Sequence, residues 1–217
     1  MGRAGESCCL LEGRSCALIV AHPDDETVWA GGLILMNPSA SWFVAALCRK
    51  NDPDRAPRFF KALRLYGASG AMADIDDGPQ QEPLPAATVR RTVLELLAER
   101  RFDVVITHGF GGEYTRHVRH EETGRAVMWL WQNSLVSAGQ LWTFAYEDGA
   151  GKYTPRPAED ADVTLELPPD IWRRKHAMIT DTYGFAAGSF EASAAGTSEA
   201  FRCLTEKTGI QNESAEL

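Results

Sequence analysis

Short apolar runs alternate along the chain with segments of helical periodicity, and this alternation constrains the fold more than any other feature. The clearest strand candidates are CALIVA at residues 16–21, WFVAALC at 42–48 and FDVVIT at 102–107. Nearly continuous apolar runs of this length are typical of parallel strands that are buried on both faces. Weaker strands are expected at residues 71–75, 141–146 and 163–167.

Helices are expected between and after these strands, at residues 26–36, 57–66, 88–100, 123–136, 169–180 and 198–207. The Gly31-Gly32 pair in the first helix would allow it to pack closely on the sheet. The β-α-β-α order predicts an α/β fold, a Rossmann-like three-layer sandwich with a mainly parallel sheet. We expect a single domain at residues 16–208, preceded by an N-terminal extension at 1–15 and followed by a flexible tail at 209–217.

The charge and the cysteine content narrow the class of protein. The 217 residues carry a formal charge of −8, which argues against a nucleic-acid partner because phosphate binding needs a clustered basic face. The sequence shows no apolar run of transmembrane length and no signal-peptide pattern. Of the five cysteines, only Cys8 and Cys9 lie close together, a pattern typical of a reduced compartment. We therefore predict a cytoplasmic protein that acts on a small molecule, with homo-oligomer formation left open.

Two polar segments that are far apart in the sequence are expected at one edge of the sheet. His22-Pro23-Asp24-Asp25 follows the strand at 16–21, and the segment 108–120, with its three histidines, follows the strand at 102–107. Ligands of parallel α/β sheets bind beyond the carboxyl ends of the strands. The fold therefore predicts that both segments line one site.

The residue types in these segments indicate a catalytic zinc site. Asp24 and Asp25 are adjacent, and two neighbouring carboxylates repel each other unless a cation lies beside them. His22 and Asp25 could bind a metal together with His117 or His120, which point to the same side of a helical turn. Three protein ligands leave a fourth position for water, whose pKa would fall towards about 7. Asp24 would then be free to act as the general base.

The motifs AHPDDE at 21–26, followed by the Gly-Gly helix, and GEYTRHVRH at 112–120 carry a resemblance to a known family. From about residue 17 to residue 204 the chain resembles the PIG-L or LmbE-like zinc-dependent de-N-acetylases, which act on N-acetylglucosaminyl lipids, thiol precursors and some antibiotics. The resemblance implies a Rossmann-like fold and one zinc, or another divalent metal, per chain. It implies the zinc ligands His22, Asp25 and His120, the general base Asp24, and His117 as the group that stabilises the oxyanion or protonates the amine.

Weaker matches to the family imply substrate-binding roles for Arg55, Asp77 and Tyr114. The chain also departs from the family pattern. Arg119 stands where the family has an aspartate that orients the first histidine of the motif, and one extra residue separates Tyr114 from that histidine. Glu121 or Glu122 is the candidate for the replacing carboxylate.

Less specific explanations exist for each residue type. HPDD is also compatible with a strand-to-helix turn capped by an aspartate, and His108 is better explained as a hydrogen-bonded rim residue than as a ligand. The predicted function is a zinc-dependent amidohydrolase that removes an N-acetyl group from an amino-sugar-containing small molecule. One alternative is a non-catalytic metal- or sugar-binding member of the same fold. The other is a nucleotide-binding regulator, which the missing phosphate loop disfavours.

Overall fold

The computed structural model describes residues 11–205, which form a seven-stranded sheet in the order β3-β2-β1-β4-β5-β9-β8. The sheet strands are β1 (Ser15–Val20), β2 (Ser41–Ala46), β3 (Ser69–Met72), β4 (Arg101–Thr107), β5 (Ser137–Phe144), β8 (Val163–Glu166) and β9 (Ser198–Leu204). The first five in the spatial order pair in parallel, whereas β9 runs antiparallel to both of its neighbours. The prediction of an α/β fold with a mainly parallel sheet is confirmed. A separate hairpin joins β6 (Tyr146–Glu147) to β7 (Arg156–Pro157).

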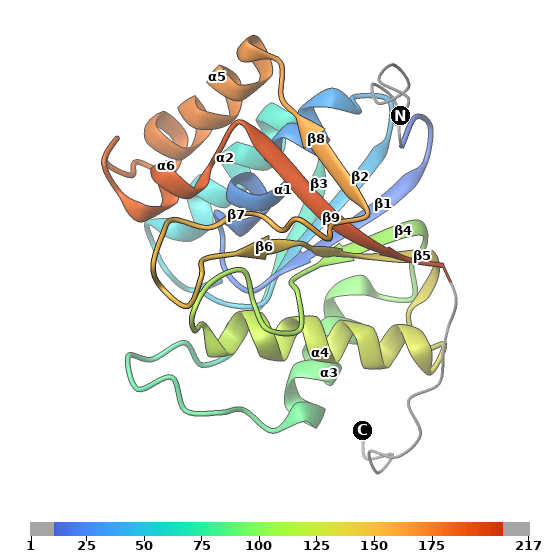
Figure 1. Ribbon diagram of the computed structural model, residues 1–217. Helices are drawn as coiled ribbons and strands as arrows, with labels where there is room; N and C mark the ends of the chain where they lie inside the picture. Colours follow the sequence, from blue (N-terminus) through green and yellow to red (C-terminus); the bar gives the residue numbers. More distant parts are fainter. Residues whose placement is uncertain (1–10, 206–217) are drawn as a thin grey trace.

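Helices cover both faces of the sheet (Figure 1). One face carries α1 (Asp25–Met36), α2 (Arg55–Tyr66), α5 (Pro169–Ala177), a π-helical turn (Met178–Thr182) and α6 (Phe190–Ala194). The other face carries α3 (Ala86–Leu97) and α4 (Val118–Gln132). The molecule is therefore the predicted three-layer sandwich. Within residues 11–205, none of these helices combines the length and the hydrophobicity needed to cross a membrane.

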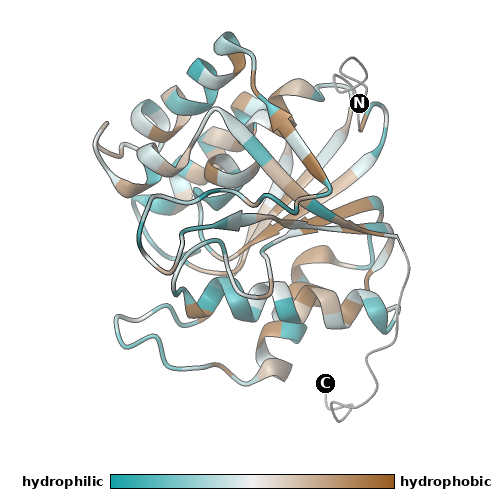
Figure 2. Ribbon diagram, viewed as in Figure 1, coloured by the Kyte–Doolittle hydropathy of each residue, from teal (hydrophilic) through white to brown (hydrophobic). Residues whose placement is uncertain are grey.

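The central strand β1 shows why its sequence is an unbroken apolar run. Cys16, Leu18 and Val20 face the layer of α1, whereas Ala17 and Ile19 face the layer of α3 and α4. All five side chains are fully buried. Figure 2 shows hydrophobic residues concentrated on the strands of the sheet, whereas hydrophilic residues are frequent on the helices and connecting loops.

The glycine pair of α1 allows the close packing that the sequence suggested. A Cβ on Gly32 would lie 2.4 Å from Leu167 Cδ2 and 3.0 Å from Glu199 Oε1. The buried Glu199 carboxylate accepts the backbone N–H groups of Gly32 and Leu33, each at 2.7 Å, and also the Lys175 ammonium group. The middle of α1 is thus hydrogen-bonded directly to a side chain of strand β9.

The helix expected at residues 198–207 is wrong, because residues 198–204 form β9. This segment pairs with β5 on one side and with β8 on the other, so its backbone groups are satisfied by the sheet. Its apolar residues are too few to distinguish a helical period from a strand period. The pairing with neighbouring strands therefore determines that the segment is a strand. Two further differences bear on the site: α4 begins at Val118 rather than at residue 123, and α6 was not expected.

The last five residues of the predicted N-terminal extension lie within the described part of the chain. Leu11 is fully buried, its N–H donates to Asn37 Oδ1 at 3.0 Å, and Ser15 already begins β1. Residues 11–15 thus pack with the domain. The remainder of the predicted extension, residues 1–10, and the tail predicted at 209–217 lie outside the described residues.

Candidate active site

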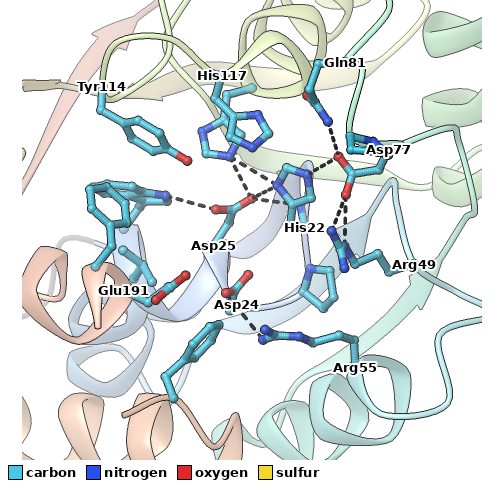
Figure 3. A pocket seen from close by; sticks show the side chains of 17 residues that line it. His22, Asp24, Asp25, Arg49, Arg55, Asp77, Gln81, Tyr114, His117 and Glu191 are labelled. Carbon is cyan, nitrogen blue, oxygen red and sulfur yellow. Dashed lines mark hydrogen bonds and ion pairs between the residues drawn. The ribbon is translucent and has the colours of Figure 1, made fainter. Parts of the chain in front are cut away.

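The two polar segments meet where the strand order reverses, between β1 and β4. His22 follows β1 by two residues, and the segment with His117 and His120 follows β4 and enters α4. They line a cavity of about 310 Å³ at the carboxyl ends of the strands. Figure 3 shows the side chains converging on it from loops and helices that are distant in the sequence.

Three of the predicted metal ligands place one atom each at the corners of a nearly equilateral triangle. His22 Nδ1 lies 3.2 Å from Asp25 Oδ2 and 3.3 Å from His120 Nε2, and the last two atoms are 3.3 Å apart. Ligands about 2.0–2.1 Å from a tetrahedral zinc ion are separated by about 3.3–3.4 Å. The donor set and its spacing therefore fit zinc.

The second ring nitrogen of each histidine faces a carboxylate. His22 Nε2 lies 3.1 Å from Asp77 Oδ1, and His120 Nδ1 lies 2.7 Å from Glu113 Oε2. Each carboxylate accepts the ring hydrogen on its own side, which leaves the lone pair of the other nitrogen directed at the triangle. This carboxylate–histidine arrangement is the usual support of a metal-binding imidazole.

The electrostatics of the triangle favour an ionised aspartate. Burial raises the pKa of Asp25, but the charges and hydrogen bonds of His120 and His108 outweigh it and hold that pKa well below its usual range. Burial lowers the pKa of His22, but its hydrogen bonds to Asp25 and Asp77 outweigh the burial and raise the pKa. Asp25 Oδ1 also accepts a hydrogen bond from Trp29 Nε1 at 3.2 Å. The site holds a carboxylate ready to bind a cation.

Asp24 is turned towards the cavity and does not cap α1. Its side chain makes no capping hydrogen bond, so the explanation of HPDD as an aspartate-capped turn does not account for this residue. Its φ of 130° is unusual for a residue other than glycine, and the Glu26 carboxylate accepts its N–H at 3.0 Å. Burial and the neighbouring Asp25 raise the pKa of Asp24 well above its ordinary value. A carboxylate of raised pKa beside the triangle can accept a proton.

His117 immediately precedes α4, with its ring against the two histidines of the triangle. Its ring centroid lies 4.3 Å from that of His120 and 4.7 Å from that of His22. Its Nδ1 is buried without a hydrogen-bond partner among the described residues. Burial, together with His120 and His22, lowers its pKa to about 3. Because one of its nitrogens lies within 4.8 Å of the ligand nitrogens of both neighbours, it could also serve as a ligand.

Glu113 is a site residue that sequence reasoning did not assign a role. Its Oε2 atom lies 2.8 Å from His108 Nδ1 and 2.7 Å from His120 Nδ1, and its Oε1 accepts the N–H of Gly109. Burial raises its pKa, but the two histidines outweigh this effect and lower it to about 2. His108 has the expected hydrogen bonds, since its Nε2 accepts the N–H of Ala21, but it is fully buried and not at the rim.

The carboxylate expected from Glu121 or Glu122 is not beside His117. Glu122 Oε2 accepts from Arg119 Nη1 at 2.7 Å, and Glu121 pairs with Arg116 and Arg125. The helical register explains this difference, because both glutamates follow His120 on α4 and their carboxylates are taken by these arginines. The carboxylates that do contact ligand-candidate histidines come from two separate loops: Asp77 contacts His22, and Glu113 contacts His120.

The three residues predicted to bind substrate all line the cavity. Asp77 is occupied by protein donors: besides His22, it receives Arg49 Nη2 at 2.6 Å and Gln81 Nε2 at 3.0 Å. These contacts favour an orienting role, and its contact with substrate stays a prediction. Arg55 stacks on the Phe185 ring at 4.2 Å and lies 3.8 Å from Asp24.

The ring of Tyr114 lies between the ring of His120 and that of Phe190 in α6. Its centroid is 5.4 Å from that of His120 and 4.8 Å from that of Phe190. Sequence reasoning missed further lining residues, namely Arg49, Gln81, Phe185, Phe190 and Glu191. The positions of Arg49 and Gln81 after β2 and β3 could have indicated them, whereas residues of α6 carried no such signal.

No family model matches the chain. An uncharacterized protein of Acanthamoeba polyphaga mimivirus is 21% identical over 146 residues, which are 60% of this chain and 61% of that protein. The match therefore spans less than two thirds of the length of that relative.

Solved structures of similar fold are more informative. The N,N′-diacetylchitobiose deacetylase of Pyrococcus horikoshii has a TM-score of 0.66 at 16% identity and covers 88% of this chain and 84% of its own. The 4-carboxy-2-hydroxymuconate hydratase GalB of Pseudomonas putida has a TM-score of 0.61 at 14% identity, with coverages of 93% and 100%. A conserved protein of Thermus thermophilus has a TM-score of 0.58 at 17% identity, with coverages of 91% and 99%.

The chain has the PIG-L/LmbE-like fold. The resemblance carried by the AHPDDE and GEYTRHVRH motifs is thus confirmed at the level of the fold. Because this fold holds a deacetylase and a hydratase, the reaction has to be argued from the site.

Proposed function

We propose that this PIG-L/LmbE-like chain is a zinc-dependent amidohydrolase that removes an N-acetyl group from an amino-sugar-containing small molecule. The observation that carries the proposal is the triangle of His22 Nδ1, Asp25 Oδ2 and His120 Nε2, with 3.2–3.3 Å edges. Asp24, a second carboxylate that is not part of the triangle, also lines the cavity. The fold shared with a diacetylchitobiose deacetylase supports the same reaction class.

In this proposal the zinc ligands are His22, Asp25 and His120, and another divalent metal could take the place of zinc. A zinc ion there supplies Lewis acidity, which polarises a carbonyl oxygen and lowers the pKa of water. Asp24 accepts the proton of the attacking water and passes it to the amide nitrogen. The C–N bond then breaks, which leaves acetate and a free amine.

His117 is the group proposed to stabilise the oxyanion. Its ring adjoins both histidine ligands, and its buried Nδ1 has no partner among the described residues. A neutral imidazole can donate one N–H to the oxygen on which charge develops, a contact that contributes most when water is excluded. Among residues 11–205 no carboxylate forms an ion pair with the ring, and burial with the two neighbouring histidines lowers its pKa, so donation to the oxyanion is favoured over protonation of the amine.

The cavity wall fits a small polar molecule with hydroxyl groups. Arg55 Nη1 and Gln81 Oε1 are a buried donor and a buried acceptor that have no hydrogen-bond partner among residues 11–205. Phe185, Phe190 and Tyr114 supply apolar surface beside them. The volume of about 310 Å³ lies at the small end of ligand sites. The cytoplasmic location and a possible homo-oligomer stay predictions.

Hydration of a carboxylated alkene is a second candidate function. Its support is the structural likeness to GalB, which is aligned over its full length, together with the free donor of Arg55 that could bind a carboxylate. Asp24 lies only 3.8 Å from that guanidinium and already balances much of its charge. The amidohydrolase is therefore preferred.

Metal content and acetate release test the proposal together. We expect about one zinc per purified full-length chain, no metal in His120→Ala, and acetate release from N-acetylglucosamine conjugates by the wild-type protein. Metal without acetate release, but with hydration of unsaturated carboxylates, would favour the second candidate. Metal with neither reaction would favour the non-catalytic binding protein. If the protein binds a nucleotide but no divalent metal, the nucleotide-binding regulator is the correct alternative.

A further inference from the structure

Arg119 is fully buried beneath the active site, although it does not line the cavity. Each nitrogen of its guanidinium group donates to one acceptor. Nε donates to the Asp76 carbonyl oxygen at 2.5 Å, Nη2 to the Glu82 carbonyl oxygen at 2.8 Å, and Nη1 to Glu122 Oε2 at 2.7 Å. A buried cation held in this way fixes whatever carries its acceptors.

Two of these acceptors belong to the irregular loop 73–85, which joins β3 to α3. The Asp76 and Glu82 carbonyl groups flank Asp77 and Gln81, the two residues of this segment that face each other at the cavity wall (Figure 3). The N–H of Leu84 donates to the other oxygen of the Arg119-bound glutamate at 2.7 Å. The loop is therefore anchored to the start of α4 on both sides of its functional residues.

This anchor connects the two histidine ligands of the proposed metal site. His120 follows Arg119 directly on α4, and the anchored loop places Asp77 Oδ1 3.1 Å from His22 Nε2. We infer that Arg119 is a positioning residue: by holding the 76–82 loop it sets Asp77 against His22 and thereby aligns that ligand with His120. The inference rests on the metal site of the proposed function.

The chemistry of the side chain explains why an arginine occupies this position. Only its planar fork can reach two carbonyl oxygens and a carboxylate at once, whereas a lysine ammonium is a point charge without that geometry. An aspartate here would bring an anion to the Asp76 and Glu82 carbonyl oxygens and to the Glu122 carboxylate. Arg119→Asp is therefore expected to damage the site, not to restore a family arrangement.

The test measures zinc affinity by chelator competition on the full-length chain, for wild type, Arg119→Lys, Asp77→Asn and the double variant. Lysine keeps the charge and loses the fork, so we expect affinity to fall about tenfold in Arg119→Lys. If Arg119 acts through Asp77, the lysine change has little further effect in the Asp77→Asn background. Arg125→Lys, on the same helix with an exposed side chain, is the matched control and keeps wild-type affinity.

The outcomes separate this inference from the proposed function. Wild-type protein that binds no divalent metal overturns both. If wild type and Arg119→Lys bind zinc equally tightly, only the role of Arg119 is overturned. The same holds if the two substitutions reduce zinc affinity independently, so that their effects multiply in the double variant. Amide hydrogen exchange of the metal-free proteins adds a readout of the loop itself. Exchange at residues 76–82 rises in Arg119→Lys if the anchor is real, and unchanged exchange contradicts it.

Discussion

Glu113 Oε2 lies 2.7 Å from His120 Nδ1, and the same oxygen lies 2.8 Å from His108 Nδ1. One fully buried carboxylate therefore orients a proposed metal ligand and, at the same time, the histidine at the end of β4. The two imidazole rings are held in a stack, with centroids 4.0 Å apart. If the proposed metal site is correct, this arrangement predicts that Glu113 contributes to metal affinity although it does not belong to the ligand triangle.

Glu113→Gln should weaken zinc binding by about ten- to a hundredfold, because the neutral amide oxygen is a poorer acceptor and the amide nitrogen cannot accept the Gly109 N–H that Oε1 accepts now. Chelator competition on the purified variant measures the change. Glu95→Gln, whose side chain is exposed on α3, is the matched control and should bind zinc like wild type. An unchanged affinity in Glu113→Gln would show that His120 is oriented by its packing alone.

Asp24→Asn should keep the metal and lose turnover. The amide nearly preserves the volume and leaves the ligand triangle intact, but it cannot accept the proton of water, so the rate should fall by about a hundredfold or more. Elemental analysis and an acetate-release assay report the two properties separately. Asp54→Asn, at the exposed residue that immediately precedes α2, should change neither. A variant of Asp24 with near-wild-type turnover would remove it from the role of general base.

Added zinc should raise the thermal midpoint of the metal-depleted protein. A ligand that binds only the folded chain stabilises it by about 2.7 kcal/mol at a hundredfold excess over its dissociation constant. The shift should be absent in His120→Ala, which loses one corner of the triangle, and chelator should reverse it in wild type. An equal shift in both proteins would place the metal somewhere else on the chain.

The part of the site that was predictable from sequence is the part encoded locally. His22, Asp24 and Asp25 follow a recognisable buried strand within five residues, and the strand ends determine the edge of the sheet at which they meet. The partners of the histidines are different. Asp77 and Glu113 reach them through the paths of two loops, which depend on side-chain anchors such as Arg119 and not on any local period.

The fold shows the same division. Strands β1, β2 and β4 were recognised because burial on both faces leaves long apolar runs, whereas the less buried β3 and β5 gave only weaker candidates at 71–75 and 141–146. β9 was mistaken for a helix because its identity depends on pairing with β5 and β8, which are distant in the sequence. The short α6, which contributes Phe190 and Glu191 to the cavity, is likewise positioned by tertiary contacts.

Gly124→Ala should destabilise the chain at the junction of α4 and β4. A Cβ at this position would lie 2.6 Å from the His108 carbonyl oxygen and 2.9 Å from that of Gly109, so the helix that carries His120 would have to move. We expect a loss of about 1–3 kcal/mol in the free energy of unfolding, measured in urea. Gly111→Ala, where an added Cβ meets nothing within 4 Å, is the control. Equal stability of the two variants would contradict the close contact.

Lys175→Met should cost about 3–5 kcal/mol in the free energy of unfolding, because it leaves the fully buried Glu199 carboxylate without its counter-ion. The same carboxylate accepts two backbone N–H groups of α1, so it cannot simply be removed. Combining the change with Glu199→Gln removes the buried charge and keeps an acceptor oxygen, and the double variant should be more stable than Lys175→Met alone. Arg156→Met breaks an exposed pair and should leave the urea midpoint unchanged. A double variant that is less stable than Lys175→Met would show that Glu199 acts through its charge on α1 and not through the ion pair.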